Sequence, residues 1–325
     1  MKKTAVAPTN IAFIKYWGRK DEILRLPTNG SISMNLNKLS TTTTVEFSGK
    51  QKKDEVIING VQNEEESSRV IKHLDRIRNL AHICAKAKVV SENNFPTATG
   101  LSSSASGFAA LTVAGSAAAG LPLDTKGLSI LARQGSGSAC RSIPDGFVEW
   151  LDGDASDTSY ARSIFPADHW DIIDVVAVVS AQRKDVSTSE GQKLVETSPF
   201  MMTRLSRMSG KITQCKKYIK EKDFRSFGEL IESEALELHA IMLTSRPSLI
   251  YWLPATIQVM KLVKKWRSEG LPVYFTVNTG QDVHLICEKK HTATLEKKLK
   301  TVPEIKRIII NNPSRGTALT NKHLF

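Results

Sequence analysis

One stretch carries most of the information in this chain: Glu92-Asn-Asn-Phe-Pro-Thr-Ala-Thr-Gly-Leu-Ser-Ser-Ser-Ala-Ser-Gly107. It combines a proline, two glycines and a series of Ser and Thr hydroxyls, and the small apolar residues 108–119 follow directly. This order predicts a hydroxyl-rich loop that opens a helix. Such a loop directs free backbone N–H groups and the positive end of the helix dipole toward one point, where phosphate binds. Taken alone, the stretch favours phosphate binding, and the alternative is a Ser-rich cap on an ordinary Ala-rich helix.

Two further stretches support the phosphate-binding interpretation. Near the N-terminus the chain reads Thr9-Asn-Ile-Ala-Phe-Ile-Lys-Tyr-Trp-Gly-Arg-Lys-Asp-Glu22, and in its middle Arg133-Gln-Gly-Ser-Gly-Ser-Ala-Cys-Arg-Ser142. Together with the loop, they resemble the signature set of the mevalonate diphosphate decarboxylases, within the superfamily of galactokinase, homoserine kinase, mevalonate kinase and phosphomevalonate kinase. The three stretches occur in that family's order and spacing, and the similarity extends over roughly the whole chain.

Composition restricts the classes of partner. The 325 residues are 41% hydrophobic and 24% charged, which is typical of a soluble globular protein, but the net charge is +12. Such an excess suits nucleic acid, an acidic membrane surface or a polyanionic small molecule. The densest basic runs lie in amphipathic helical contexts, and no zinc-finger or basic-aromatic RNA motif occurs. We therefore expect no nucleic-acid partner and a positive field that attracts a polyphosphate substrate.

Cysteine spacing and hydropathy predict a cytoplasmic protein. Cys84, Cys140, Cys215 and Cys287 form no C-x-x-C pair, so reduced thiols are expected. The sequence has no signal-peptide pattern and no apolar run long enough to span a bilayer, which predicts no membrane partner. Cys140 lies within the Gly-Ser stretch, where a small buried side chain is expected rather than a nucleophile.

Hydrophobic periodicity predicts both strands and helices along the chain. In the first half, strands are expected over residues 10–17, 40–47 and 86–90, a hairpin with an Asn-Gly turn over 56–61, and helices over 63–85 and from Asp124 to about residue 134. The second half begins with an apolar strand over 171–180 and a capping box at Ser187. Helices are expected over about 194–220, 222–241, 248–268 and 291–300, and strands over 273–277, 283–287 and 305–310.

These elements predict an α+β protein of two lobes that divide near residue 180, with a ligand cleft between them. The predicted domains are residues 1–180, which contain the phosphate-binding loop, and residues 181–325, which form an α/β sandwich. The family resemblance implies the same arrangement, with an S5-like N-terminal lobe and a ferredoxin-like C-terminal lobe.

The resemblance also implies an ATP-dependent decarboxylase of isoprenoid biosynthesis, in the mevalonate pathway. The 3-hydroxyl of (R)-5-diphosphomevalonate accepts the γ-phosphoryl group of ATP, and phosphate and CO2 then leave to give isopentenyl diphosphate. The implied cofactors are ATP and Mg²⁺, the implied partner is a small phosphorylated mevalonate, and a homodimer is expected.

The loop supplies the expected ATP contacts, with Ser103 and Ser104 nearest the phosphates. The full set of expected ATP-binding residues is Asn94, Pro96, Thr97, Gly100, Ser102, Ser103 and Ser104. We expect Mg²⁺ to bind through ATP, with Ser104 as the candidate protein ligand.

The other two stretches supply the expected substrate contacts. Arg141 occupies the family position that grips the substrate carboxylate, a task that suits a bidentate guanidinium. Lys15 is expected to neutralise charge at the reacting centre, and Tyr16, as either a contact or a packing residue, lies near the 5-phosphate end. The remaining expected substrate-binding residues are Arg19, Lys20, Ser136, Ser138, Ser187 and Thr188, the last two as contacts to substrate or ATP. The family usually has Lys where this chain has Arg19, which keeps the charge but changes the donor geometry.

One departure from the family pattern affects the catalytic residues. Where the family has Asp-Ala-Gly-Pro-Asn, this chain reads Asn278-Thr-Gly-Gln-Asp282. That first Asp is the family's catalytic carboxylate, and Asn cannot take up a proton. Asp282 could supply the carboxylate across a turn at Gly280, the kinase step could be lost or altered, or position 278 could be changed in this sequence. We favour the first, so the expected catalytic residues are Lys15, Arg141, Asp282 and Asn278.

Three alternative functions stay open on the sequence. The substrate could be 5-phosphomevalonate, giving isopentenyl phosphate, or the enzyme could be a mevalonate 3-kinase that does not decarboxylate. CO2 release separates that kinase from both decarboxylases. A basic RNA-binding protein is the non-enzyme alternative, since S5-like lobes occur in ribosomal proteins, and it predicts strongly salt-dependent RNA binding.

Overall fold

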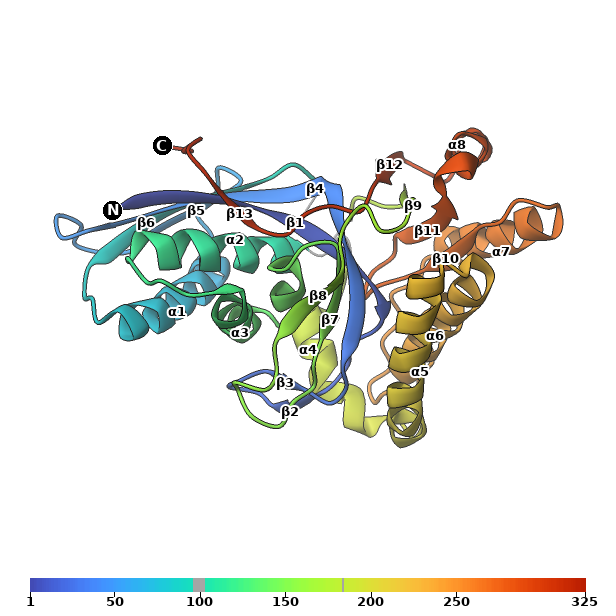
Figure 1. The fold of residues 1–325 in the computed structure, drawn as a ribbon, viewed down its shortest axis with the longest axis horizontal. Coiled ribbons are helices and arrows are strands. Elements are labelled where there is room, and N and C mark those ends of the chain that lie inside the picture. Colours follow the sequence, from blue (N-terminus) through green and yellow to red (C-terminus); the bar gives the residue numbers. More distant parts are fainter. Residues whose placement is uncertain (96–102, 183) are drawn as a thin grey trace.

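A long two-stranded ribbon extends from the N-terminal end of the molecule to its centre (Figure 1). The structure is a computed structural model that describes residues 1–95, 103–182 and 184–325. The ribbon consists of β1 (Lys2–Ile14) and β4 (Ser31–Ser48), which pair antiparallel along nearly their full length. Their register shifts between Pro8 and Thr9, so the ribbon has two halves that pack against different helices.

The first half of the ribbon lies within the N-terminal sheet, whose order in the described chain is β13-β1-β4-β6-β5. β5 (Glu55–Ile58) runs parallel to β6 (Lys86–Asn93), and the other pairings of this sheet are antiparallel. β7 (Phe147–Trp150) pairs with the first residues of β4 on one side and with β8 (Ala161–Phe165) on the other. β13 (Ala318–Thr320), near the C-terminus, pairs with β1. A small ribbon of β2 (Arg19–Asp21) and β3 (Leu26–Pro27) lies apart.

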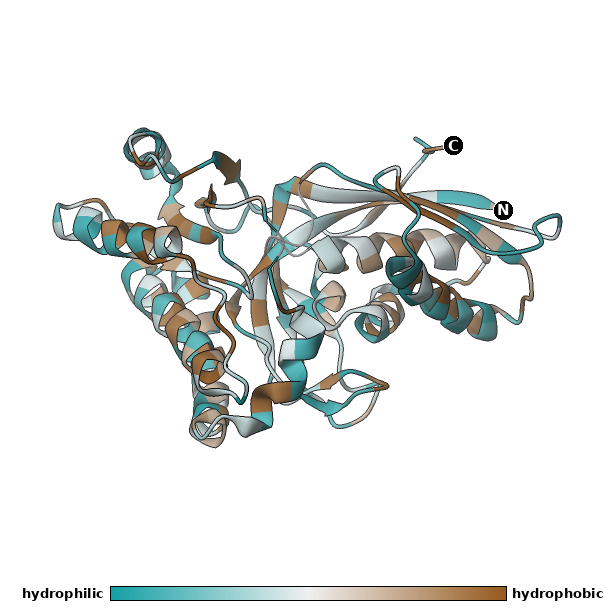
Figure 2. Cartoon of the chain, turned by 180° about the vertical axis from the view of Figure 1, so that it is seen from behind, coloured by the Kyte–Doolittle hydropathy of each residue, from teal (hydrophilic) through white to brown (hydrophobic). Residues whose placement is uncertain are grey.

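Three helices cover one face of this sheet: α1 (Glu64–Ala81), α2 (Ser103–Ala118) and α3 (Thr125–Gly135). The α2 helix is apolar on nearly all sides because it is buried between α1, α3 and the sheet, whereas α1 is amphipathic (Figure 2). An added Cβ at Gly115 would lie 2.7 Å from Ile77 Cδ1, so glycine permits the close contact of α1 with α2.

The C-terminal lobe is a four-stranded antiparallel sheet of order β10-β11-β9-β12 with helices on both faces. Its strands are β9 (Ile172–Val178), β10 (Tyr274–Thr276), β11 (Val283–Glu288) and β12 (Arg307–Asn311). α7 (Pro254–Ser268) and α8 (Thr292–Lys300) pack on one face, and α5 (Met201–Glu221) and α6 (Phe224–Thr244) on the other. The short α4 (Thr188–Gly191) precedes them.

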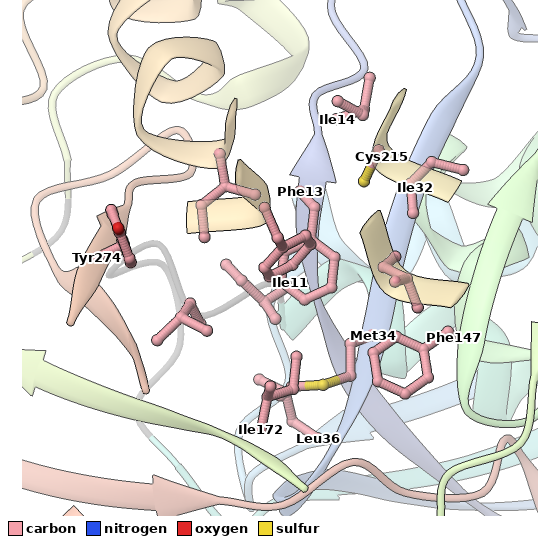
Figure 3. Packing of buried hydrophobic residues seen from close by; sticks show 14 of the residues in the cluster. Ile11, Phe13, Ile14, Ile32, Met34, Leu36, Phe147, Ile172, Cys215 and Tyr274 are labelled. Carbon is pink, nitrogen blue, oxygen red and sulfur yellow. The ribbon is translucent and has the colours of Figure 1, made fainter. Parts of the chain in front are cut away.

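The second half of the ribbon joins the lobes through a shared apolar core (Figure 3). Ile11 and Phe13 of β1 and Met34 of β4 pack in one cluster with α5, α6 and the inner face of the C-terminal sheet. Phe13 and Phe227 meet edge to face with ring centroids 4.8 Å apart. The two lobes therefore share buried surface around one continuous strand pair.

The α+β class and the two-lobe arrangement are confirmed. The Asn-Gly turn is present at Asn59 and Gly60, which have φ values of 50° and 78°, but β5 takes its main partner from β6. The helix expected from residue 194 begins only at Met201, because residues 192–197 form a 3₁₀ turn. β9 belongs to the C-terminal sheet although it precedes residue 180, and the domain division near that residue stays a prediction.

Five of the described strands were not foreseen from the sequence: β2, β3, β7, β8 and β13. Each is short and gains its stability from pairing with a neighbour, so its residues carry little periodic signal of their own. Within the three described ranges, no helix combines the length and apolar character that crossing a membrane requires.

Candidate active site

A cavity of about 470 Å³ opens between the lobes at the end of β1. The N-terminal lobe supplies its walls from α1, the start of α2 and the 3₁₀ turn η1 (Gly137–Ser142). The C-terminal lobe closes it with α4 and the connection between β10 and β11, which contributes Asn278 and Thr279. Segments far apart in sequence therefore meet at one site.

Arg141 lines this cavity and is 4% exposed. Its Nε and Nη2 donate to Asn10 Oδ1 at 3.3 and 3.1 Å, and Asn10 Nδ2 in turn donates to Ser142 Oγ at 2.8 Å. Among the described residues, Arg141 Nη1 has no hydrogen-bond partner. A buried guanidinium that is held by Asn10 and still has an unused donor suits a carboxylate or phosphate ligand.

Lys15 is buried beside Arg141 and follows β1 directly. Its Nζ donates to Ala12 O at 2.6 Å and to Asn278 Oδ1 at 3.0 Å. Burial is the main cause that lowers the pKa of Lys15 from 10.5 to about 7. Asn278 is fixed in turn, since its backbone oxygen accepts from Nε2 of the buried His239 at 3.0 Å. Burial lowers the pKa of His239 to about 3, so this ring is neutral and structural.

Tyr16 is both a packing residue and a wall of the cavity. Its ring lies 4.6 Å from that of Trp150, and its hydroxyl accepts from Arg19 Nε at 2.9 Å. An added Cβ at Gly137 would lie 2.8 Å from Tyr16 Cε1, so glycine is required there. The structure brings Arg19 to the cavity but not Lys20, whose ammonium bonds to Asp152 O and pairs with an exposed carboxylate at the surface.

The expected phosphate-binding end lies at the start of α2. Ser103, Ser104, Ser136 and Ser138 all line the cavity, and the hydroxyls of Ser104 and Ser136 are 3.5 Å apart. The part of α2 that the structure describes therefore begins at the cavity, and the first turn of a helix offers backbone N–H donors to an anion.

The remaining loop residues differ in position. Asn94 lies outside the described lining, because its side chain bridges the backbone of Lys38 and Ser40. Pro96, Thr97, Gly100 and Ser102 lie outside the residues that the structure describes.

Ser187 and Thr188 reach the cavity from the start of α4. Ser187 forms the expected capping box with Glu190, and Thr188 Oγ1 lies 2.8 Å from Thr279 Oγ1. Lys184 lies behind them, donating to Thr188 Oγ1 at 2.6 Å and Thr279 O at 2.7 Å. Burial lowers the pKa of Lys184 to about 8. Lys184 was not among the site residues expected from the sequence, although it lies only three residues before the Ser187 capping box.

Asp282 is not brought to the cavity. It is 3% exposed and its Oδ1 accepts the backbone N–H of Val179 at 3.0 Å, at the end of β9. Among the described lining residues, the segment after β10 contributes Asn278 and Thr279 and not Asp282. The chain turns between these positions, as expected, but the turn directs Asp282 into the C-terminal sheet rather than toward Lys15 or solvent.

The far end of the cavity was missed from the sequence. It is apolar, with Ile58, Val70, Val89 and Phe108, and Arg69 lies over the Phe108 ring at 5.1 Å. These residues come from β5, α1, β6 and α2, so no short motif could reveal them. Such a slot between a sheet and two helices fits a flat aromatic group.

Positive charge dominates the cavity wall. Its described basic residues are Lys15, Arg19, Arg25, Arg69, Arg141 and Lys184, against the carboxylates Glu65, Glu66 and Glu190. Burial, and after it the nearby Arg19, lowers the pKa of Arg25 to about 10, which shows that the cations repel one another here. A bound polyanion would relieve this repulsion.

Two family models match the chain. The diphosphomevalonate decarboxylase-like N-terminal domain matches residues 7–161, and the mevalonate 5-diphosphate decarboxylase C-terminal domain matches residues 174–318. The diphosphomevalonate decarboxylase of Aspergillus fumigatus is 40% identical over 81% of this chain and 70% of its own length. The human diphosphomevalonate decarboxylase is 37% identical over 85% of this chain and 74% of its own.

The chain is also similar to solved structures of mevalonate diphosphate decarboxylases. A structure described as MDDEF in complex with MVAPP, AMPPCP and magnesium has a TM-score of 0.93 and 40% identity, covering 98% of this chain and 99% of that one. The mevalonate diphosphate decarboxylase from Staphylococcus aureus has a TM-score of 0.93 and 39% identity, covering 98% of each chain.

Proposed function

Because the chain belongs to the diphosphomevalonate decarboxylase family, we propose that it converts (R)-5-diphosphomevalonate to isopentenyl diphosphate with ATP. ATP phosphorylates the 3-hydroxyl, and phosphate and CO2 then leave. The binding of MVAPP and an ATP analogue by a protein of 40% identity supports this assignment.

The buried guanidinium of Arg141 is the single observation that carries the proposal. Arg141 lines the cavity and its buried Nη1 has no hydrogen-bond partner among the described residues, so the guanidinium retains donors for a carboxylate ligand. Asn10 holds Nε and Nη2 and fixes the plane of the group. A carboxylate held in this way is oriented so that its C–C bond can break while positive charge develops at C3.

ATP fits the other part of the cavity. The apolar slot of Ile58, Val70, Val89 and Phe108 takes the adenine, and the start of α2 takes the phosphates. Ser103 and Ser104 donate to the phosphates, and the Lys184 ammonium lies on the opposite wall. Arg19 and Tyr16 then hold the 5-diphosphate of the substrate.

The donor set fits Mg²⁺ that binds with ATP. Among the described residues, no cluster of three or more His, Cys, Asp or Glu side chains could hold a metal by itself. Mg²⁺ usually keeps several waters and binds mainly through substrate phosphates, and Ser104 is the hydroxyl placed to join it. When bound, the ion neutralises charge on the phosphates during transfer.

The test is a complete product balance. The protein receives ATP and Mg²⁺ with either mevalonate 5-diphosphate or mevalonate 5-phosphate, and CO2, ADP and phosphate are measured together. We expect equal yields of the three from the diphosphate. ADP without CO2 would identify a kinase, faster turnover of the monophosphate would change the assigned substrate, and no ADP from either would reject the proposal.

Three expectations from the sequence remain proposals. The homodimer is tested by light scattering on the purified protein, and the cytoplasmic location by cell fractionation. The division into domains 1–180 and 181–325 is tested by limited proteolysis, which should cut near residue 180.

A further inference from the structure

The proposed reaction needs a group that takes the proton of the tertiary hydroxyl when that oxygen attacks ATP. A carboxylate is not available for this task near Lys15. No carboxylate oxygen of the described residues lies within 4.0 Å of Lys15 Nζ, which instead bonds to two neutral oxygens, Ala12 O and Asn278 Oδ1. The residues left undescribed, 96–102 and 183, contain neither Asp nor Glu.

The carboxylates that do line the cavity lie elsewhere and have other partners. Glu65 and Glu66 belong to the first turn of α1, at the end of the cavity that holds Arg69. Glu190 Oε2 accepts the backbone N–H of Ser187 at 2.9 Å as part of the capping box. None of the three is placed beside Lys15 and Arg141.

The charged groups around Lys15 do not offset the effect of burial on the pKa of its amine. Glu234 on α6 accepts the backbone N–H of Lys15 at 3.1 Å, but its carboxylate is already paired with Arg204 of α5 and with Lys211. Arg141 of η1 and Arg204 oppose a charge on Lys15, while Glu234 and Asp174 of β9 favour it. Burial exceeds all of these, and the pKa of Lys15 falls to about 7. His239, which holds Asn278, is neutral.

We propose that Lys15, as an uncharged amine, accepts the proton of the substrate 3-hydroxyl and later returns it to the departing phosphate. This rests on the proposed function. Lys15 is the amine that lines the cavity directly beside Arg141, so a carboxylate on Arg141 places the neighbouring hydroxyl toward Nζ. Asn278 positions Nζ through a neutral oxygen, whereas an Asp there would keep the amine charged.

The proton and electron balance closes with this one group. The hydroxyl oxygen bonds to the γ-phosphorus, the bond from that phosphorus to ADP breaks, and the proton moves to Nζ. In the second step the C3–O bond breaks and its electron pair leaves with the phosphate. The C–C bond to the carboxylate breaks, CO2 leaves, and that pair forms the alkene. The ammonium gives its proton to the phosphate, which regenerates the amine.

The first experiment compares pH profiles of kcat/KM for wild type, Asn278→Asp and Asn278→Ala. The wild-type rate should fall on the acidic side with a midpoint near 7, the value of the free enzyme. Asn278→Asp supplies a carboxylate base, so its midpoint should lie about one pH unit or more lower. Asn278→Ala supplies no carboxylate, so the midpoint of its pH profile should not be lowered in this way. Ionisations of the substrate are common to all three, and equal midpoints in Asp and Ala variants would overturn the proposal.

The second experiment is a double-mutant cycle. Lys15→Arg keeps the charge but cannot lose its proton, so ADP formation should fall about 100-fold or more in the wild-type background. In the Asn278→Asp background the same change should cost about tenfold or less, because the carboxylate takes the proton. Equal losses in both backgrounds would show that Lys15 acts only as a charge. If Lys15→Arg does not fold, the pH profiles decide alone.

An NMR titration of ¹³C-labelled lysines measures the pKa of the Lys15 amine directly, without catalytic turnover. The resonance that disappears in Lys15→Arg should titrate near pH 7 in wild type and at clearly higher pH in Asn278→Asp. A Lys15 that is still charged at about pH 9 in wild type would reject the proposal. Failure of the proposed function would look different, since wild-type protein would then release no CO2.

Discussion

At the scale of single residues, the site depends on polar groups that are buried at a cost. Arg141 and Lys15 are both nearly excluded from solvent, and burial lowers the pKa of each. A cation in such a place is tolerated when its neighbours supply hydrogen bonds, as Asn10 and Ala12 do here. This desolvation cost has a functional benefit, because a cation shielded from water interacts strongly with an anionic ligand.

Replacing Arg141 tests the carboxylate grip. Arg141→Lys should leave the fold intact and lower kcat/KM by about 10- to 100-fold, because an ammonium cannot make two parallel bonds and one charged bond is worth roughly 1.5–3 kcal/mol. The measurement is steady-state CO2 release together with the melting temperature. Arg162→Lys is the matched control, since Arg162 is half-exposed and pairs with Glu149 outside the cavity. Wild-type turnover by Arg141→Lys would show that the carboxylate binds elsewhere.

Replacing Lys15 tests the cost of burial. Because its pKa is lower in the folded state than in the unfolded chain, stability should rise as pH increases from about 7 toward 10.5. Lys15→Met should therefore raise the free energy of unfolding by about 1–4 kcal/mol at pH 6 while turnover is lost. The gain should shrink as the pH rises from about 7 to 10, because the folded protein is then relieved of the buried charge while the unfolded chain still holds the proton. A constant difference between pH 6 and pH 10, from urea unfolding, would contradict this.

At the scale of elements, the start of α2 carries the proposed phosphate-binding site. The helix is buried over most of its length, and it lines the cavity with Ser103 and Ser104 of its first turn and with Phe108 farther along. Its free N–H groups and the hydroxyls of Ser103 and Ser104 therefore point to one place. The N-terminal turn of α4 faces the same cavity through Ser187 and Thr188, which explains how two helix starts from different lobes can share one nucleotide.

Removing one hydroxyl tests this element. Ser104→Ala should weaken binding of a non-hydrolysable ATP analogue by about 3- to 10-fold, since a neutral hydrogen bond contributes roughly 0.5–1.5 kcal/mol. Affinity for mevalonate diphosphate should hardly change. Calorimetric titration measures both, with Ser206→Ala on the exposed side of α5 as control. Unaltered affinity for the analogue in Ser104→Ala would remove this hydroxyl from the phosphate cradle.

At the scale of the molecule, the β1–β4 ribbon makes the two lobes one cooperative body. Its first half packs against α2, and its second half packs between α5, α6 and the C-terminal sheet. The cavity lies where β1 ends, next to this shared core, so residues of both lobes are held in fixed relation. The apolar cluster around Phe13 and Phe227 is the centre of that contact.

This arrangement predicts a single unfolding transition. Phe227→Ala removes a fully buried ring from the shared cluster and should destabilise the protein by about 3–5 kcal/mol. Fluorescence of Trp150 in the N-terminal lobe and of Trp266 in the C-terminal lobe, each observed in a variant that lacks the other tryptophans, should report the same midpoint. Separate midpoints in the wild-type background would show that the lobes unfold independently.

The sequence alone determined the family, the α+β class and most of the helices and longer strands, because these follow from periodicity and caps within one segment. It also predicted that Arg141, Lys15, Ser103 and Ser104 would serve one site, and the structure brings them to one cavity. The sequence could place these residues together because each lies in a short motif with a local geometric cause, while their roles stay predictions.

The tertiary structure alone decided what depends on contacts between distant segments. The apolar slot is built from four separate elements, and β7, β8 and β13 exist through pairing with partners far along the chain. The turn after β10 sends Asp282 to the Val179 N–H and leaves Asn278 beside Lys15, because the end of β9 offers an unpaired donor there. Sequence spacing shows that a turn is present, but which residue it directs inward depends on the hydrogen-bond partners that the fold provides.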